Sequence, residues 1–292
     1  MSKVFLKDHG KMPAGAIFLS GSGTNAEKIL SQFHDPAVHR GWVPKVLVTD
    51  RPKTSRARVI AEKYGLPLIE HGLAAFYRRH GLDSVSLATE EGRRVRGLWT
   101  LALQEKLADF QVDFGIFAGF VTLTNLAASL PCLNVHPGDL TYRKDGRRYL
   151  TGLHTIPVEL AILEGIGYLR SSVILIRPFS GDPDEVDSGH ILGISDRVPL
   201  DLQGHSVEEL RAVYRTRKQP HIHGANRDLL FDLADRNQER LKFAGDHVVY
   251  PEVIDDFARN RFTEADDGGL LYDGEPVTTV EYRADGSRTP VR

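Results

Sequence analysis

The sequence predicts an α/β fold with a mostly parallel sheet flanked by helices, and three observations support this fold class. Short apolar runs alternate with helical hydrophobic patterns along most of the chain. The apolar runs are hydrophobic at nearly every position, as in strands that are covered on both faces. A glycine-rich turn joins the first long apolar run to the helical pattern that follows it. A C-terminal helix and a β-hairpin are expected in addition.

In the first half of the chain, strands and helices are expected to alternate as a parallel sheet requires. The expected strands are residues 14–19 (AGAIFL), 45–50 (KVLVTD), 67–70, 114–118 and 131–136. The expected helices are residues 25–33, 55–64 and the long amphipathic segment 90–110. This half, residues 1–130, contains the glycine turn and is interpreted as the phosphate-binding half.

The second half, residues 131–292, is interpreted as the catalytic half of one domain that spans residues 1–292. Its expected helices are residues 155–163, a charged segment 207–241 that is broken at Pro220, and residues 250–260. Its expected strands are residues 171–176 and 190–199. The tail 269–282 alternates around Asp273-Gly274, which is a strong hairpin signal.

Composition and charge favour a cytoplasmic enzyme that acts on small molecules. The chain has 292 residues, 41% of them hydrophobic, and its 37 basic and 39 acidic residues give a net charge of −2. Such a balance creates no field that attracts nucleic acid or a membrane, so neither partner is expected. The single cysteine, Cys132, cannot form an intrachain disulfide, and no apolar run is long enough to span a bilayer.

The glycine turn Ser20 to Asn25 is a candidate anion site. Gly21, Gly23, Thr24 and Asn25 lie between an expected strand and a helix N-terminus, where free backbone N–H groups and the helix dipole favour a phosphate. The segment also fits the pattern G-x-G-x-x-A, and Asp50 ends the next strand, so a dinucleotide-binding dehydrogenase is an alternative. A plain tight turn between strand and helix is the third interpretation.

Asn134 and His136 are the candidate catalytic pair. Alternation along the expected strand places both on one side of the sheet, and Pro137-Gly138 ends the strand where parallel sheets bind ligands. An amide and an imidazole supply a donor for an oxyanion and a route for a proton. The structural alternative for His136 is a buried histidine that is satisfied by the backbone.

The polar segment 181–189 (GDPDEVDSG) supplies Asp187 as the carboxylate that completes this pair. Its several acids also suggest calcium, but Pro183 and Val186 interrupt the ligand spacing. His221 and His223 form another conceivable metal pair, without further obvious ligands. No metal site is therefore assigned.

Six segments, in order along most of the chain, resemble the glycinamide ribonucleotide formyltransferase family, which is folate-dependent and serves purine biosynthesis. They are Ser20-Gly21-Ser22-Gly23-Thr24-Asn25, Ala118-Gly119-Phe120, Asn134-Val135-His136-Pro137, Gly152-Leu153-His154-Thr155, Asp184-Glu185-Val186-Asp187-Ser188-Gly189 and Gly245-Asp246-His247-Val248-Val249-Tyr250-Pro251. Ordered matches of this kind are far more specific than one glycine motif. The resemblance implies a Rossmann-like formyltransferase fold and 10-formyltetrahydrofolate as the formyl-donating cosubstrate.

The resemblance also implies a role for each matched residue. Asn134, His136 and Asp187 would be catalytic, and no metal would be needed. The residues implied for the substrate phosphate are Gly21, Gly23, Thr24, Asn25 and Arg96, with Arg93 and Arg94 as neighbouring alternatives to Arg96. Those implied for the rest of the substrate are Gly119, Asp246 and His247. Those implied for the folate are Ala118, Phe120, Val121, Leu133, Asp184, Glu185 and Val186.

Several positions depart from the family pattern and leave alternatives open. Val121-Thr122 replace a methionine and an arginine that usually contact the folate tail, and Asp246 replaces a glutamate. The basic stretch 143–148 is either an anion clamp or a solvated loop. Extra residues at about 200–245 form either a homodimer contact or an altered acceptor pocket. One alternative is a hydrolase that releases formate from 10-formyltetrahydrofolate, which Pro137 disfavours because such enzymes typically carry a second histidine at that position. A further alternative is an inactive formyltransferase-like binding protein.

Overall fold

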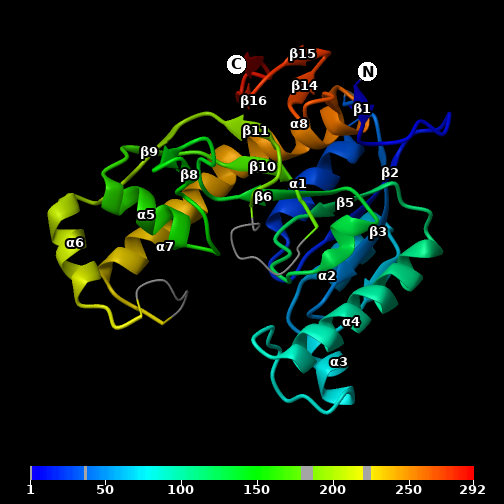
Figure 1. The fold of residues 1–292 in the computed structure, drawn as a ribbon, viewed down its shortest axis with the longest axis horizontal. Coiled ribbons are helices and arrows are strands. Elements are labelled where there is room, and N and C mark those ends of the chain that lie inside the picture. The colour runs from blue at the N-terminus through cyan, green and yellow to red at the C-terminus, as the bar shows by residue number, and fades with distance from the viewer. Residues whose placement is uncertain (1, 36–37, 179–186, 220–224) are drawn as a thin grey trace. The chain divides into compact units, whose positions relative to one another are not determined.

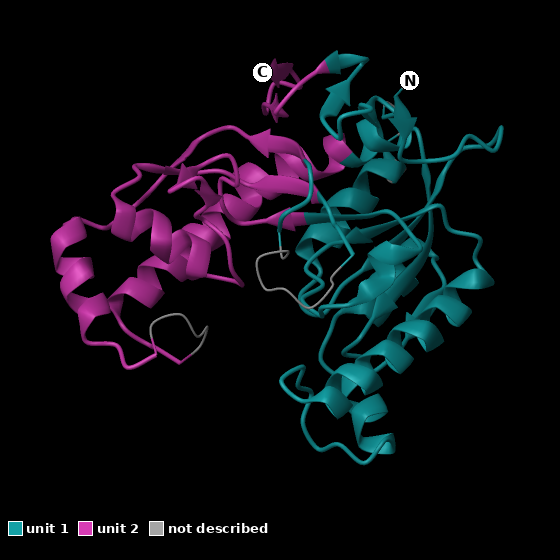
Figure 2. Cartoon of the chain, in the orientation of Figure 1, with its two compact units in different colours: residues 1–134, 175–190, 254–275 teal, residues 135–174, 191–253, 276–292 magenta. Residues whose placement is uncertain are grey.

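The computed structural model describes residues 2–35, 38–178, 187–219 and 225–292, and these residues form two compact units (Figure 2). Unit 1 consists of Met1–Asn134, Leu175–His190 and Ile254–Glu275. Unit 2 consists of Val135–Ile174, Ile191–Val253 and Pro276–Arg292. Each unit combines strands with helices, as an α/β fold requires (Figure 1). The predicted fold class is confirmed.

Unit 1 contains a parallel sheet in the strand order β6-β5-β2-β3-β4. The strands are β2 (Ala14–Phe18), β3 (Val43–Thr49), β4 (Leu68–Glu70), β5 (Phe114–Phe117) and β6 (Cys132–His136), the last of which continues into unit 2. Ile17 and Leu47 alternate with Ala16 and Val46, and all four side chains are completely buried. The sheet is therefore covered on both faces, as the unbroken apolar runs predicted.

The helices of unit 1 begin and end at recognisable signals. They are α1 (Thr24–Ser31), the 3₁₀ turn η1 (Gln32–His34), α2 (Ala57–Tyr64), α3 (Leu73–Arg79), α4 (Glu90–Ala108) and η2 (Asn125–Ala128). The Thr89 hydroxyl accepts a hydrogen bond from the Gly92 N–H and caps α4, while Gly65 ends α2 in the left-handed conformation. Helix α3 is an addition to the predicted elements.

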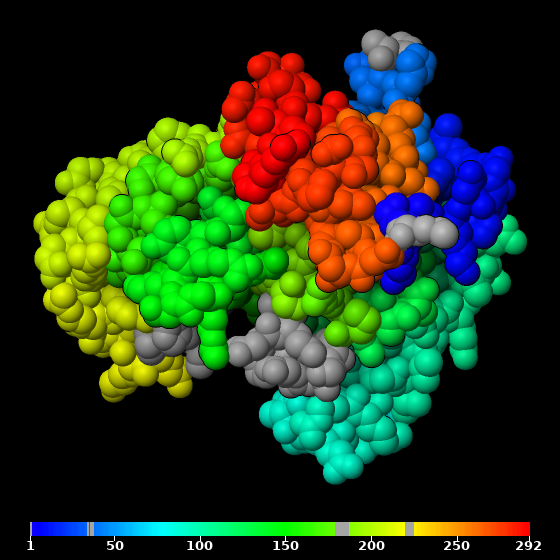
Figure 3. Space-filling view, turned by 45° about the horizontal axis from the view of Figure 1, so that its top comes forward, coloured from blue at the N-terminus to red at the C-terminus, as the bar shows by residue number. Residues whose placement is uncertain are grey.

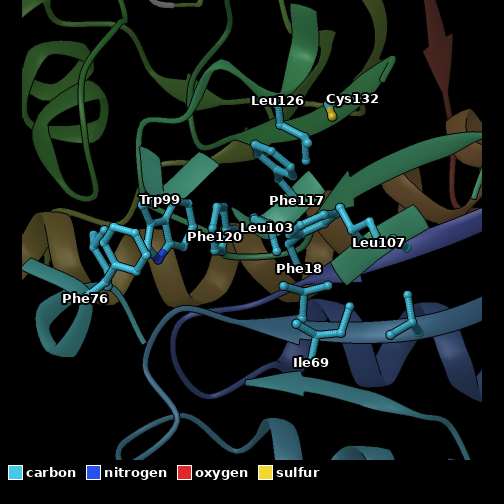
Figure 4. Packing of buried hydrophobic residues seen from close by; sticks show 14 of the residues in the cluster. Phe18, Ile69, Phe76, Trp99, Leu103, Leu107, Phe117, Phe120, Leu126 and Cys132 are labelled. Atoms are coloured by element: carbon cyan, nitrogen blue, oxygen red, sulfur yellow. The ribbon is translucent and has the colours of Figure 1, made fainter. Parts of the chain in front are cut away.

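A hydrophobic cluster that is rich in aromatic side chains includes residues of the central strands of unit 1 (Figure 4). Phe18, Phe117 and Phe120 pack edge to face, with ring centroids 5.0–5.4 Å apart. Cys132 begins β6 within the same cluster, as the sequence predicted, and burial raises the pKa of its thiol. The packing of these rings therefore holds the ends of β2 and β5, from which the following turns begin.

A small antiparallel sheet completes unit 1. It orders β1 (Lys3–Val4), β13 (Phe262–Glu264), β14 (Leu270–Tyr272) and β15 (Glu275–Pro276), and the last strand continues across the unit boundary. Asp273 and Gly274 join β14 to β15 with φ angles of 50° and 84°. Two successive positive φ angles are those of a type I′ turn, so the predicted hairpin is confirmed.

The strands of unit 2 form a mixed sheet in the order β17-β16-β11-β10. These strands are β10 (Ser172–Leu175), β11 (Ile191–Ser195), β16 (Thr279–Tyr282) and β17 (Arg288–Val291), and only β11 and β16 pair in parallel. The predicted strand 190–199 is divided: β11 ends at Ser195, and β12 (Val198–Pro199) pairs with β9 (Tyr168–Leu169) instead.

The helices of unit 2 are α5 (Ile156–Glu164), α6 (Val207–Arg215), α7 (Leu229–Leu241), the π-helical turn η4 (Lys242–Asp246) and α8 (His247–Ala258), which extends into unit 1. Ser206 and Glu209 form a capping box that starts α6. Helix α8 begins three residues before the predicted position, because the turn η4 continues directly into it. The segment around α6 lies at the surface (yellow in Figure 3). No described helix is long and apolar enough to cross a membrane.

A buried ion cluster joins the helices of unit 2. The guanidinium of Arg217, whose side chain is 2% exposed, donates to Glu159 on α5 at 2.5 Å and forms a two-pronged pair with Asp228 at 2.7 and 2.8 Å. Asp228 also accepts from the Phe231 N–H and so caps α7. One cation thereby holds the helical segment 200–245 against α5.

Substitution of Arg217 by methionine is expected to lower the free energy of unfolding by about 3 kcal/mol, because it leaves two carboxylates without their buried cation. Urea denaturation followed by circular dichroism measures this change. Arg215→Met is the control, since Arg215 pairs with Glu208 at the surface and both side chains are 65% exposed. Its loss is expected to stay below about 1 kcal/mol. Equal losses in the two variants would contradict a structural role for the cluster.

Candidate active site

Strands β2 and β5 of unit 1 end level with Asn134 of β6, and this row and the turns after it carry predicted site residues. Phe18 pairs with Phe117 in the register of β2 and β5, and Phe117 pairs with Asn134 in that of β5 and β6. Because the strands are parallel, the glycine turn, the turn after β5 and Asn134 lie at the same edge of the sheet. This carboxyl edge is where open α/β sheets bind ligands.

The two glycines of the turn differ in what they require. Gly23 is the N-cap of α1 with a φ of 70°, and a Cβ there would come within 2.4 Å of Ile60 and 2.7 Å of Leu19. Gly23 is therefore needed by the fold itself. At Gly21 an added Cβ would meet nothing within 4 Å. No side chain caps α1, so Thr24 and Asn25 begin a helix whose N-terminus suits an anion.

A buried carboxylate ties the turn after β2 to the turn after β5. Asp50 is 3% exposed, accepts from the Ser20 hydroxyl at 2.7 Å, and accepts from the Thr122 hydroxyl at 2.5 Å through its other oxygen. In the dinucleotide interpretation Asp50 would instead bind a ribose hydroxyl. Its burial and its two internal partners disfavour that interpretation. No sequence pattern predicted this network, because its members are far apart along the chain.

Thr122→Val is expected to destabilise the chain by about 1–3 kcal/mol, because it leaves one oxygen of a buried carboxylate without its donor. Valine keeps the shape of threonine, so packing changes little. The measurement is the free energy of unfolding in urea. Thr54→Val, at an exposed position of unit 1, is the control and is expected to be neutral. An unchanged stability of Thr122→Val would show that the Asp50 network does not hold the two turns.

The turn after β5 uses much of its backbone to bind the turn after β2. The Ala118 N–H donates to the Phe18 carbonyl at 2.9 Å, and the Gly119 carbonyl accepts from the Ser20 N–H at 3.1 Å. The Val121 N–H lies 3.4 Å from the Ser20 hydroxyl. Phe120 is buried in the hydrophobic cluster of unit 1. Contacts of this turn with a folate are therefore expected from its remaining backbone groups.

Leu133, the remaining described residue of the predicted folate set, is completely buried. Its side chain belongs to the interior of unit 1, so a folate contact at this position would also involve the backbone. Asp184, Glu185 and Val186 lie outside the described residues.

Arg96 is the arginine of α4 that reaches the turn after β5. Its guanidinium donates to the Leu123 carbonyl at 2.5 Å and lies 5.6 Å from the centre of the Tyr77 ring. The two alternatives make contacts close to themselves in sequence: Arg93 donates to the Leu87 and Ala88 carbonyls, and Arg94 forms a two-pronged pair with Glu91. The geometry favours Arg96 among the three.

Asn134, the first residue of the candidate catalytic pair, lies in β6 two residues before the strand ends. It is half-buried, and among the described residues its amide has no hydrogen-bond partner. A half-buried amide that does not serve the fold fits a group that donates to a substrate oxygen.

His136 lies in unit 2, two residues further along β6, and is 3% exposed. Its Nε2 is 2.7 Å from the Leu150 carbonyl oxygen. Since a carbonyl only accepts, Nε2 is the donor in this bond. The structural interpretation of a backbone-satisfied histidine is therefore correct for this ring nitrogen.

Asp246 and His247 lie where η4 passes into α8, also in unit 2. The Asp246 carboxylate is buried and accepts from the Ser171 hydroxyl at 2.5 Å. The His247 ring packs edge to face on the exposed ring of Phe243, with 5.1 Å between ring centres. π-helical turns are frequent at functional sites. Asp246 also has a structural role that the sequence did not indicate.

Asp187 belongs to unit 1 and has a φ of 59°. Gly189, two residues later, is tightly enclosed: a Cβ there would come within 1.7 Å of the Leu175 carbonyl oxygen. The conceivable metal pair His221 and His223 lies outside the described residues. Within the described part of the chain, no three His, Cys, Asp or Glu side chains are grouped to hold a metal.

The basic stretch 143–148 is a short hairpin of β7 (Arg143–Lys144) and β8 (Arg147–Arg148). Asp145 and Gly146 form its turn with φ angles of 52° and 78°. Lys144 pairs with Glu164 at 2.7 Å and lies 4.8 Å from the centre of the Tyr149 ring. The stretch is exposed, as expected of a surface loop, but it has a defined backbone and is anchored to α5.

Comparison with known proteins shows similarity of structure. No family model matches the sequence, and no curated protein matches it. A phosphoribosylglycinamide formyltransferase from Coxiella burnetii has a TM-score of 0.59 at 17% identity, with 93% of this chain and 100% of that chain covered. The enzyme of the same name from Anaplasma phagocytophilum has a TM-score of 0.60 at 19% identity, covering 94% and 100%.

A formyltetrahydrofolate deformylase from Burkholderia mallei has a TM-score of 0.50 at 14% identity, covering 91% of this chain and 72% of that chain. At such identities the comparison concerns the fold. The order of strands, the glycine turn and the position of Asn134 on β6 are thus features of a chain that has the fold of the phosphoribosylglycinamide formyltransferases.

Proposed function

We propose that this chain transfers a formyl group from 10-formyltetrahydrofolate to a substrate amine, with glycinamide ribonucleotide or a related amine as the acceptor. One observation carries the proposal. At the carboxyl edge of the unit 1 sheet, an uncapped helix N-terminus suits a phosphate, and Asn134 offers an amide that has no partner among the described residues. The likeness in fold to formyltransferases supports the same function.

In the proposed reaction, the amine attacks the formyl carbon, a C–N bond forms, and negative charge develops on the formyl oxygen. Asn134 and protonated His136 donate to this oxygen in the transition state. The proton of the attacking amine leaves through Asp187 and water, and the folate N10 receives a proton as its bond to carbon breaks. Tetrahydrofolate and the formylated amine are released. None of these steps requires a metal or a covalent enzyme intermediate.

The remaining site residues have binding roles in this proposal. Gly21, Gly23, Thr24 and Asn25 bind the acceptor phosphate through backbone N–H groups, and Arg96 adds a positive charge. Gly119, Asp246 and His247 contact the rest of the acceptor. The folate is held by Ala118, Phe120, Val121 and Leu133, together with Asp184, Glu185 and Val186. A cytoplasmic location, the two halves of the chain and a homodimer that uses the segment 200–245 also remain predictions.

The alternative is hydrolysis of the same donor, with water in place of the amine and formate as the product. The likeness to a formyltetrahydrofolate deformylase favours this alternative. The Pro137 that follows His136 disfavours it, because it stands where hydrolases of this kind carry a second histidine.

The test is to incubate the purified chain with 10-formyltetrahydrofolate, with and without glycinamide ribonucleotide, and to follow tetrahydrofolate release. We expect release only with the amine. Release without the amine would establish hydrolysis, and no release in either case would contradict both hydrolysis and transfer to this acceptor. Nicotinamide cofactor binding, measured by fluorescence quenching, is expected to be absent.

A further inference from the structure

Ser20 lies at the centre of the contact between the turn after β2 and the turn after β5. Its N–H donates to the Gly119 carbonyl at 3.1 Å. Its hydroxyl accepts from the Val121 N–H at 3.4 Å and donates to Asp50 at 2.7 Å. Ser20 is 4% exposed and Asp50 is 3% exposed, so water competes little for these partners. The bonds around Ser20 therefore fix the distance between the two turns.

The Asp50 carboxylate uses one oxygen for each turn. Its Oδ1 accepts from the Ser20 hydroxyl at 2.7 Å, and its Oδ2 accepts from the Thr122 hydroxyl at 2.5 Å. The Nε of Arg51 lies 3.8 Å from Oδ2, beyond hydrogen-bond distance, and the Arg51 side chain is 54% exposed. The two hydroxyls, rather than the cation, hold the carboxylate. An asparagine could not replace it, because an amide offers one acceptor oxygen and one donor group.

In the proposed function, the two turns serve different substrates. The turn after β2 binds the acceptor phosphate through backbone groups such as that of Gly23, and the turn after β5 binds the folate through groups such as that of Val121. A site binds its ligand more tightly when its backbone is already held in the bound geometry. Asp50 is thus placed to prepare both sites with one side chain.

We propose that Asp50 is a positioning residue shared by the two substrate sites, which holds both turns in register and thereby raises the affinity for both substrates. This inference rests on the proposed function and adds to it a residue that acts through the two turns. It also predicts how the ligands influence each other. With Asp50 in place, neither ligand has to order the turns, so the two bind nearly independently. Without it, the first ligand orders the turns and the second binds to turns that are already ordered.

Asp50→Asn tests the proposal, and Asp255→Asn is the matched control. Asp255 is also a buried carboxylate of unit 1 with a donor on each oxygen, the Gly41 N–H at 2.5 Å and the Arg259 Nε at 2.9 Å. Gly41 precedes β3, so this carboxylate lies at the amino end of that strand, away from both turns. Both variants are expected to lose stability, but only Asp50→Asn is expected to loosen the turns.

Amide hydrogen exchange, followed by NMR without any ligand, measures the turns themselves. In Asp50→Asn the N–H groups of Ser20 and Val121, one in each turn, are expected to exchange about 10-fold faster than in Asp255→Asn, because a bond to a charged group is lost. Equal exchange in the two variants would overturn the proposal, as would faster exchange in one turn alone. Thr122→Val removes one bond to the carboxylate and is expected to give the same changes at smaller size; it replaces Asp50→Asn if that variant does not fold.

Isothermal titration calorimetry with inorganic phosphate and with tetrahydrofolate, separately and together, measures the two sites. In Asp50→Asn both Kd values are expected to rise about 10-fold, and saturating phosphate is expected to lower the Kd for tetrahydrofolate about 5-fold, which lies in the usual range of coupling between sites. In the wild type and in Asp255→Asn this second factor is expected to stay below about twofold. Kd values in Asp50→Asn that match those of Asp255→Asn would contradict the shared role, and so would a rise for one ligand only.

The exchange and calorimetry measurements require no formyl transfer, so their results are separate from that of the formyl-transfer assay. If Asp50→Asn loosens both turns and weakens both ligands while the wild type transfers no formyl group, the shared positioning is correct and the proposed reaction is wrong. If transfer occurs and Asp50→Asn behaves as Asp255→Asn does, the proposed function stands and the positioning is wrong. A wild type that binds neither ligand would overturn both.

Discussion

Substitution of His136 by glutamine is expected to lower kcat for formyl transfer by about 10²–10³-fold, the range for loss of one donor to a developing oxyanion. Glutamine places an amide N–H where histidine has Nε2, so the bond to the Leu150 carbonyl is retained. A neutral amide cannot replace the protonated imidazole as a donor to the formyl oxygen. The free energy of unfolding is therefore expected to change by no more than about 1 kcal/mol.

His136→Ala separates the two roles of the ring. Alanine removes the donor to the Leu150 carbonyl and leaves a buried acceptor unpaired, which is expected to cost about 1–3 kcal/mol of stability. Steady-state kinetics and urea denaturation are measured on both variants. His205→Gln, in which a histidine at the surface of unit 2 is replaced, is the control and should keep full activity. Near wild-type kcat in His136→Gln would exclude His136 from the chemistry.

Asn134→Ala is expected to lower kcat by about 10²–10³-fold, the usual cost of removing one donor to a developing oxyanion. KM is expected to change little, because the charge on the formyl oxygen develops only in the transition state. Stability is expected to stay within about 0.5 kcal/mol, since the amide has no hydrogen-bond partner among the described residues. Kinetics and unfolding measured on the same preparation test both parts.

Asn134→Asp sharpens this test because aspartate keeps the shape of asparagine but places negative charge near the oxyanion. It is expected to be at least as inactive as Asn134→Ala. Asn226→Ala is the control, since Asn226 donates to the Gln219 carbonyl in the connection between α6 and α7. If Asn134→Ala loses stability and keeps its kcat, Asn134 belongs to the fold and not to the reaction.

The parallel sheet was predictable because its signal is local. Segments such as 14–18 and 46–48 are apolar at successive positions, a pattern that is typical of strands covered on both faces. The glycine turn was predictable for a similar reason, because a helix N-cap with a positive φ angle, such as that at Gly23, favours glycine. The hairpin at Asp273-Gly274 follows from the backbone angles that this dipeptide favours.

The features that the sequence did not predict depend on contacts between distant residues. Asp50 joins Ser20 and Thr122, which are 30 and 72 positions away, and the Leu150 carbonyl is 14 positions from the ring that it holds. The strand 190–199 was predicted as one element, yet Val198 pairs with Leu169 rather than with the main sheet. Patterns within a short window carry no information about such partners.

The helical connection after Pro199 was recognised as extra length, but its role in unit 2 depends on Arg217. That residue looks like any other basic residue in the charged segment 207–241. In the structure it is buried, and it bonds Glu159 and Asp228. Only packing against α5 distinguishes it from exposed neighbours such as Arg215.

The fate of the formyl carbon tests the central claim most directly. The chain is incubated with 10-formyltetrahydrofolate labelled with ¹³C in the formyl group, together with glycinamide ribonucleotide, and the products are observed by ¹³C NMR. The proposed function predicts that the label appears as a formamide on the acceptor at a rate that depends on acceptor concentration. Label that accumulates as formate at a rate independent of the acceptor would contradict it.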